Sequence, residues 1–148
     1  QGRGVKVLEI NLYDLTIDML KTREGSSEGS NLWDEILVAE PEVEKEALQE
    51  LLQNVLDIKG HLIPEIGERL AQSDHDVLFL SGVGEVFPYI RSHNVLNNLQ
   101  STAKDKPTVM FFPGEYRHSL EQGASLELFG LLHDDKYYRA FNIFDIQA

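Results

Sequence analysis

The residues best spaced for chemistry lie in one stretch, 81–100, with the sequence SGVGEVFPYIRSHNVLNNLQ. Gly82 and Gly84 follow an apolar run with strand character, and residues with helical spacing come next, which is a common layout for a phosphate-binding turn. A dinucleotide site needs a third glycine in the pattern G-x-G-x-x-G, but Phe87, followed by Pro88, stands there instead. We therefore predict that the two glycines shape a turn and let a helix begin, without binding a cofactor.

Other catalytic patterns do not occur in this sequence either. There is no G-x-x-x-x-G-K-[ST] run for a nucleotide phosphate, and Ser81 does not stand in a G-x-S-x-G elbow. Cysteine is absent, and the 5 histidines show no H-E-x-x-H spacing. The prediction is a protein with no catalytic, cofactor or metal residues. The alternative is a degenerate nucleotide-binding domain or enzyme that uses loops 81–88 and 113–118.

A group of polar residues follows the glycines and alternates with apolar ones: Arg91, Asn94, Asn97 and Asn98. Asparagine is a poor helix former, and its amide costs free energy when it is buried without a partner. We expect these amides to bond backbone at the sheet edge or to face a binding partner. Arg91 is expected to pair with Glu85 or Glu115, as a structural clamp between two loops.

The elements that position these residues follow from hydrophobic periodicity. Short apolar runs predict strands at 5–11, 76–82, 106–114 and 137–144. A 3.6-residue spacing predicts helices at 12–21, 31–39, 41–57, 62–70, 85–100 and 125–132. Asn31 and Asp34 are expected to cap the second helix, Gly60 to end the third, and Pro64 to fit the first turn of the fourth.

This order of elements predicts an α/β fold. We expect a three-layer α/β/α arrangement around a mainly parallel sheet of about four or five strands, Rossmann-like but without a P-loop. Parallel strands end at one edge of a sheet, so loops 81–88 and 113–118 should lie together there. Residues 1–148 are expected to form a single domain, with a mobile Gly/Ser-rich loop around 23–31.

The charge of the chain narrows the choice of partners. Its 25 acidic and 13 basic residues give a formal net charge of −12. Lysine and arginine provide most nucleic-acid affinity, so direct binding of nucleic acid or of an anionic membrane by this domain is not expected. A basic protein partner, or solubility alone, explains the charge better. The acidic face formed by Glu42, Glu44, Glu46 and Glu50 is interpreted first as a solvated helix face.

Three motifs in sequence order carry a resemblance to a known family. They are VLFLSGVGEVFPYIRSHNVLNNLQ, KPTVMFFPGEY and SLELFGLLHDDKYYRAFNIF. They resemble the BrxB family of BREX bacteriophage-defence systems, closely over residues 76–144 and more loosely before. The resemblance implies an additional N-terminal segment in family members, so we expect this chain to be truncated. If that segment adds a strand, the chain should expose a sheet edge and could self-associate.

The resemblance also implies a function. It implies a cytoplasmic bacterial adaptor without catalytic activity, within a system whose chemistry belongs to a DNA methyltransferase, an AAA+ ATPase and PglZ, a protein of the alkaline-phosphatase superfamily. PglZ is the expected partner, and the AAA+ ATPase a possible second one. The characteristic motif residues, expected to be structural or to face the partner, are Gly82, Gly84, Glu85, Pro88, Arg91, Asn97, Asn98, Pro113, Gly114, Glu115, Tyr116, Tyr137, Tyr138 and Arg139.

Overall fold

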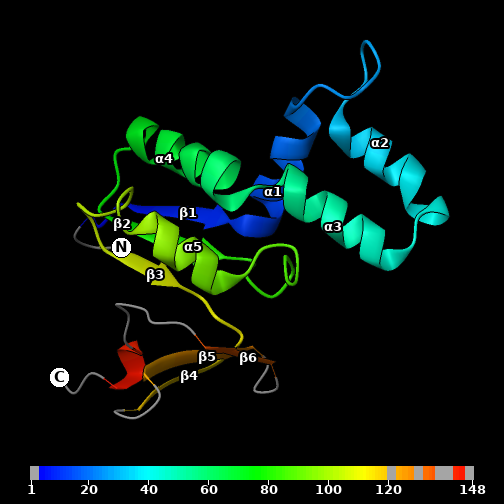
Figure 1. Ribbon diagram of the computed structural model, residues 1–148. Helices are drawn as coiled ribbons and strands as arrows, with labels where there is room; N and C mark the ends of the chain where they lie inside the picture. Colours follow the sequence, from blue (N-terminus) through cyan, green and yellow to red (C-terminus); the bar gives the residue numbers. More distant parts are fainter. Residues whose placement is uncertain (1–3, 120–122, 129–131, 136–141, 146–148) are drawn as a thin grey trace.

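A computed structural model describes residues 4–119, 123–128, 132–135 and 142–145 of the chain (Figure 1). For residues 115–119, 123–128 and 132–135 it describes the backbone alone. The elements are β1 (Val7–Asn11), α1 (Leu12–Thr22), α2 (Leu32–Ala39), the 3-10 turn η1 (Glu40–Glu42), α3 (Lys45–Val55), the π-helical turn η2 (Ile58–Leu62), α4 (Ile63–Gln72), β2 (Val77–Ser81), α5 (Ser92–Leu99), β3 (Thr108–Met110), β4 (Gly114–Ser119), β5 (Gly123–Leu128), β6 (Leu132–Asp135) and the 3-10 turn η3 (Ile143–Asp145).

The main sheet is parallel, with the strand order β1-β2-β3. Val7 pairs with Val77, and Leu78 pairs with Thr108. The α/β class and the strands predicted near 5–11, 76–82 and 106–114 are confirmed. In the described part of the chain this sheet has three strands, so the predicted count of four or five and the three-layer, Rossmann-like arrangement are not confirmed.

Both crossover connections place helices on one face of this sheet. The chain steps from β1 to β2 and from β2 to β3 in the same direction, and right-handed connections then put the intervening helices on the same side. The contacts agree, because α4 packs against α5 and η2 also touches α5 (Figure 1). The hydrophobic core lies between these helices and the covered face of the sheet, around the fully buried side chains of Leu12, Leu15, Leu20, Leu62, Ile66, Leu78, Leu80, Ile90 and Val95.

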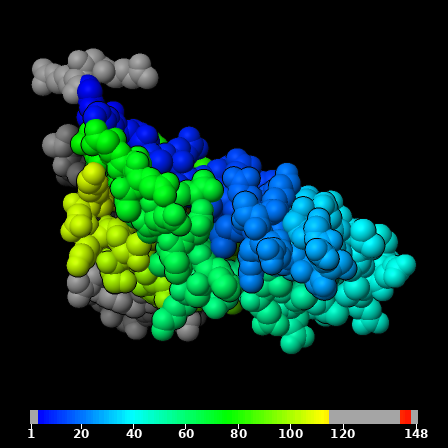
Figure 2. Space-filling view, turned by 90° about the horizontal axis from the view of Figure 1, so that it is seen from above, coloured from blue at the N-terminus to red at the C-terminus, as the bar shows by residue number. Residues whose placement is uncertain are grey.

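Two asparagines begin the N-terminal helices. The side-chain oxygen of Asn11 accepts hydrogen bonds from the backbone N–H of Tyr13 at 2.9 Å and of Asp14 at 3.2 Å, so β1 runs directly into α1. The Asn31 oxygen accepts from the N–H of Asp34 at 2.9 Å, which confirms the predicted cap of α2. The α2 and α3 helices extend to one end of the molecule, as Figure 2 shows.

The helix predicted at 41–57 begins later than expected. Pro41 lies in η1, and α3 starts only at Lys45, after Val43 and Glu44 leave the helical path. The prediction that Gly60 ends this helix is wrong, because α3 ends at Val55 and Gly60 lies inside η2, which continues into α4. Pro64 occupies the first turn of α4 as predicted.

The helix predicted at 85–100 is wrong over its first half. Residues 82–91 form turns with a cis peptide between Phe87 and Pro88, and α5 begins at Ser92. Proline lacks a backbone N–H and disfavours helical geometry in the residue before it, so a helix could not run through this position. The polar residues 91–98 therefore mark a separate short helix and its start.

The C-terminal part also differs from the prediction. Residues 114–119 are the strand β4, not a loop, and the helix predicted at 125–132 is replaced by β5 and β6 in an antiparallel sheet with the order β4-β5-β6. Short apolar runs are compatible with the residue spacing of a helix or of a strand, and here antiparallel pairing stabilises the strands. Of the final strand predicted at 137–144, residues 137–141 lie outside the described residues, and Ile143–Asp145 form a 3-10 turn.

No helix in the described part of the chain has both the length and the apolar character needed to cross a membrane.

Candidate functional site

The glycine turn after β2 packs against the start of α1. Gly82 has a φ of +72°, a left-handed conformation that favours glycine. A Cβ atom at this position would collide with the Asn11 side chain and would lie 3.1 Å from the backbone nitrogen of Tyr13. The open side of Gly82 is thus filled by the residue that caps α1. The glycines shape a turn, as the sequence predicted, but the helix that they were expected to begin starts only at Ser92.

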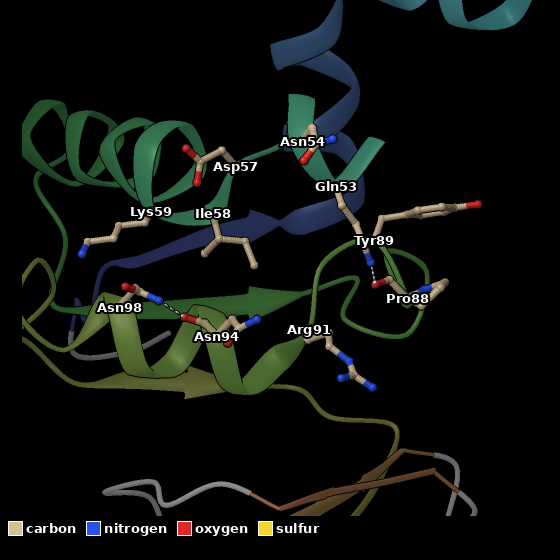
Figure 3. A pocket seen from close by; sticks show the side chains of 10 residues that line it. All are labelled: Gln53, Asn54, Asp57, Ile58, Lys59, Pro88, Tyr89, Arg91, Asn94 and Asn98. Carbon is tan, nitrogen blue, oxygen red and sulfur yellow. Dashed lines mark hydrogen bonds between the residues drawn. The ribbon is translucent and has the colours of Figure 1, made fainter. Parts of the chain in front are cut away.

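A polar groove lies beside this turn, on the helix-covered side of the sheet (Figure 3). Its volume is about 550 Å³. One wall comes from the end of α3 and from η2, and the other from the 88–91 turn and α5. We call this feature the polar groove; it is lined by Gln53, Asn54, Asp57, Ile58, Lys59, Pro88, Tyr89, Arg91, Asn94 and Asn98.

Two hydrogen bonds hold the walls of the polar groove. Gln53 Nε2 donates to the Pro88 carbonyl oxygen at 3.4 Å, and so links α3 to the turn before α5. Asn98 Nδ2 donates to the Asn94 carbonyl oxygen at 2.7 Å, within α5 (Figure 3). The Asn98 amide thus bonds backbone, but within its own helix and not at the sheet edge as expected.

Other groups in the groove are available to a ligand. Within the part of the chain that the structure describes, the side chains of Asn54, Lys59 and Asn94 make no hydrogen bond or ion pair. Each side-chain amide carries both a donor and an acceptor, so two of them can satisfy peptide units of an extended segment. The groove can therefore hold a polypeptide segment, and its cations can hold a carboxylate.

The predicted clamp through Arg91 is not formed with Glu85. Among the described side chains no ion pair joins these two residues, and the Arg91 guanidinium lies over the Phe87 ring, 5.9 Å from its centroid. The alternative partner, Glu115, has a side chain outside the described residues. Arg91 is exposed, so its charge reaches solvent at the mouth of the groove.

The shifted pKa values belong to residues away from the groove. Hydrogen bonds from the hydroxyls of Ser30 and Ser26 lower the pKa of the Glu35 carboxyl, which closes the 23–31 segment onto α2. A hydrogen bond and charge attraction from Lys6 lower the pKa of Asp74, and the same pair raises the pKa of Lys6. The described residues contain no group of three or more acidic, histidine or cysteine side chains that could hold a metal ion.

The predicted site residues divide into three groups. Pro88, Arg91 and Asn98 line the polar groove. Gly82, Gly84 and Glu85 lie in the turn after β2, Asn97 is exposed on α5, and Pro113 precedes β4, whose first residues are Gly114, Glu115 and Tyr116. Tyr137, Tyr138 and Arg139 lie outside the described residues.

Sequence reasoning missed the other wall of the groove. Gln53, Asn54, Asp57, Ile58 and Lys59 come from a segment about thirty residues upstream of the motif, and spacing gave no reason to join the two. One signal was available, since Gln53 and Asn54 place two adjacent amides near the end of this helix.

These features define an α/β domain that carries a polar groove next to the carboxyl edge of a small parallel sheet. The family model for BREX protein BrxB matches residues 8–143, and the chain belongs to the BrxB family. This membership implies a component of a BREX phage-defence system.

Two relatives share the name BREX protein BrxB. The protein from Bacillus cereus (strain H3081.97) is 54% identical over 71 residues, which cover 48% of this chain and 34% of the relative. The protein from Escherichia coli O9:H4 (strain HS) is 28% identical over 134 residues, which cover 90% of this chain and 60% of the relative. The chain thus matches about a third and about three fifths of these two proteins. No solved structure matches the chain.

Proposed function

We propose that this protein is a non-catalytic adaptor of a BREX phage-defence system, acting in the bacterial cytoplasm, and that it binds PglZ. Family membership supports the system. The polar groove supports the mode of action, because the amides of Asn54 and Asn94 line it together with charged side chains on the surface (Figure 3).

One observation carries the proposal: the side chains of Asn54 and Asn94 face the polar groove and make no hydrogen bond within the described part of the chain. Asn54 stands on the α3 wall and Asn94 on the α5 wall. An extended segment of the partner lying between them would receive hydrogen bonds from both sides. Each such bond contributes about 1 kcal/mol when the partner segment is already ordered.

The experiment is isothermal titration of the purified protein with purified PglZ. Replacing Asn54 and Asn94 together by alanine should weaken binding by roughly tenfold or more, since two hydrogen bonds are lost. Asn97→Ala is the matched control, because Asn97 is an exposed asparagine on α5 that does not line the groove. The proposal fails if the wild-type protein does not bind PglZ, and the groove is the wrong surface if both variants bind like wild type.

The alternative is a degenerate nucleotide-binding domain or enzyme. Lys59 and Arg91 favour it, because both cations line the groove, where either could meet a phosphate. A nucleotide present at 100-fold its dissociation constant should stabilise the protein by about 2.7 kcal/mol. A thermal-shift screen of nucleotides with magnesium therefore decides between the candidates, and a clear shift would favour the alternative.

A further inference from the structure

The second face of the parallel sheet carries a patch of apolar side chains beside Glu9, Asn11 and Ser81, and the described helices do not cover it. Side chains alternate along each strand, so Val7, Val77, Phe79 and Val109 point away from the side that carries Leu78 and Leu80. Phe111 joins them, because its ring packs edge to face against Phe79 with centroids 5.2 Å apart. We call these five residues the open face.

The open face is separate from the hydrophobic core. None of its five residues belongs to the core cluster or packs against it. Val7 is 48% exposed and Phe111 is 52% exposed, while Val77, Phe79 and Val109 are half-buried. Parallel sheets are normally covered on both faces, because βαβ crossovers place helices there. In the part of the chain that the structure describes, helices form a layer on one face of this sheet and not on the other.

The size of the open face indicates what covers it. Strands lie about 4.8 Å apart and rise about 3.3 Å per residue, so three short strands present an area of roughly 10 Å by 16 Å. A helix is about 10 Å across and reaches 16 Å in about 11 residues. One helix of this length therefore fits the face.

The charges of the face and of the whole chain also favour a helix from a partner over a second copy. The one ionisable side chain on this side of the three strands is Glu9, which is exposed and accepts a hydrogen bond from the Ser81 hydroxyl at 3.1 Å. The chain as a whole has a net charge of −12, so two copies repel each other. A helix with an apolar stripe would cover the apolar side chains, and a lysine or arginine beside that stripe would lie opposite Glu9.

We infer that the open face docks an amphipathic helix of the protein partner, with a basic residue placed against Glu9. This inference rests on the proposed function and adds a contact surface on the opposite side of the sheet from the polar groove. The docked helix would complete the α/β/α layering that the strand composition predicted.

The test compares two pairs of substitutions in titrations with PglZ. Val7→Glu with Phe111→Glu places two carboxylates on the open face and should weaken binding at least tenfold. Leu37→Glu with Val38→Glu is the matched control, because these residues are 46% and 77% exposed on α2 and lie off the face. The control should bind within twofold of wild type. Equal affinity for both pairs overturns the inference while the proposed function stands.

Two further measurements separate loss of binding from misfolding and from self-association. Val7→Thr with Phe111→Thr adds no charge and keeps strand propensity, so it should fold like wild type and still weaken binding by about threefold or more. Sedimentation of the protein alone should show a monomer. A dimer that the glutamate pair abolishes would identify a second copy as the occupant, and the inference would be wrong. If wild type does not bind PglZ at all, the proposed function itself fails.

Discussion

The two faces of the parallel sheet are built from the same strands but have different surroundings. On one face Ile10, Leu78 and Leu80 are at most 2% exposed, under the helices that connect the strands. On the other, Val7 and Phe111 remain about half exposed. Topology accounts for the difference in burial, because both crossovers step in the same direction and bring the connecting helices to one side.

Truncating one residue on each face tests this difference between the two faces most directly. Leu80→Ala empties a fully buried site and should lower the free energy of unfolding by about 3 kcal/mol. Phe79→Ala removes a larger but half-buried side chain, and should cost about 1 kcal/mol in the isolated protein. Urea unfolding followed by circular dichroism gives both values. Equal losses would show that the open face is already covered.

The next largest effect is expected at Gly82, where the sheet meets α1. Gly82→Ala forces a side chain into a left-handed backbone conformation and against the Asn11 side chain, so a loss of about 2 kcal/mol is expected. Chemical denaturation measures it. An unchanged stability would mean that this turn does not constrain the edge of the sheet.

A smaller effect is expected from the cap of α1 itself. Asn11→Ala removes the oxygen that accepts from the N–H groups of Tyr13 and Asp14, and should cost about 1 kcal/mol. The same unfolding assay applies, and Asn11→Asp, which keeps the accepting oxygen, serves as the control with a near-normal stability. If both variants lose the same free energy, capping is not the reason for the loss.

The smallest effect is expected far from both faces, at Glu35. Its folded pKa lies below the usual value, so its hydrogen bonds to Ser26 and Ser30 stabilise the 23–31 segment above the unfolded pKa. That contribution is lost as pH falls through the folded pKa. Amide chemical shifts of Ser26 and Ser27, followed by NMR in acid, should titrate in wild type and lose this transition in Glu35→Gln. A transition that persists in the variant would contradict the assignment.

Local signals in the sequence predicted the strands and capped helices well. The apolar run 76–82 became β2, and Asn31 became the cap of α2, because backbone pairing and capping depend on neighbouring residues. The region after Pro113 was predicted wrongly, since its short apolar runs suit a helix or a strand and long-range pairing decided between them.

One wall of the candidate site was predicted from the sequence, and the opposite wall was not. Pro88, Arg91 and Asn98 were named from their motif, and all three line the polar groove. The opposite wall, from Gln53 to Lys59, depends on how η2 and α4 pack beside α5, which no local pattern encodes. The uncovered face was not predicted for a related reason. The apolar strands suggest a sheet covered on both faces, and the direction of the crossover connections cannot be inferred from the sequence of a single strand.

The most direct measurement replaces Phe111 with a photo-cross-linking phenylalanine analogue in cells that carry the whole defence operon. Phe111 directly follows β3, which ends at Met110. The account predicts a cross-link from this position to PglZ, and none from the same analogue placed at Val38 on α2, which is more exposed. Identical products from both positions, or no product from position 111, would contradict it.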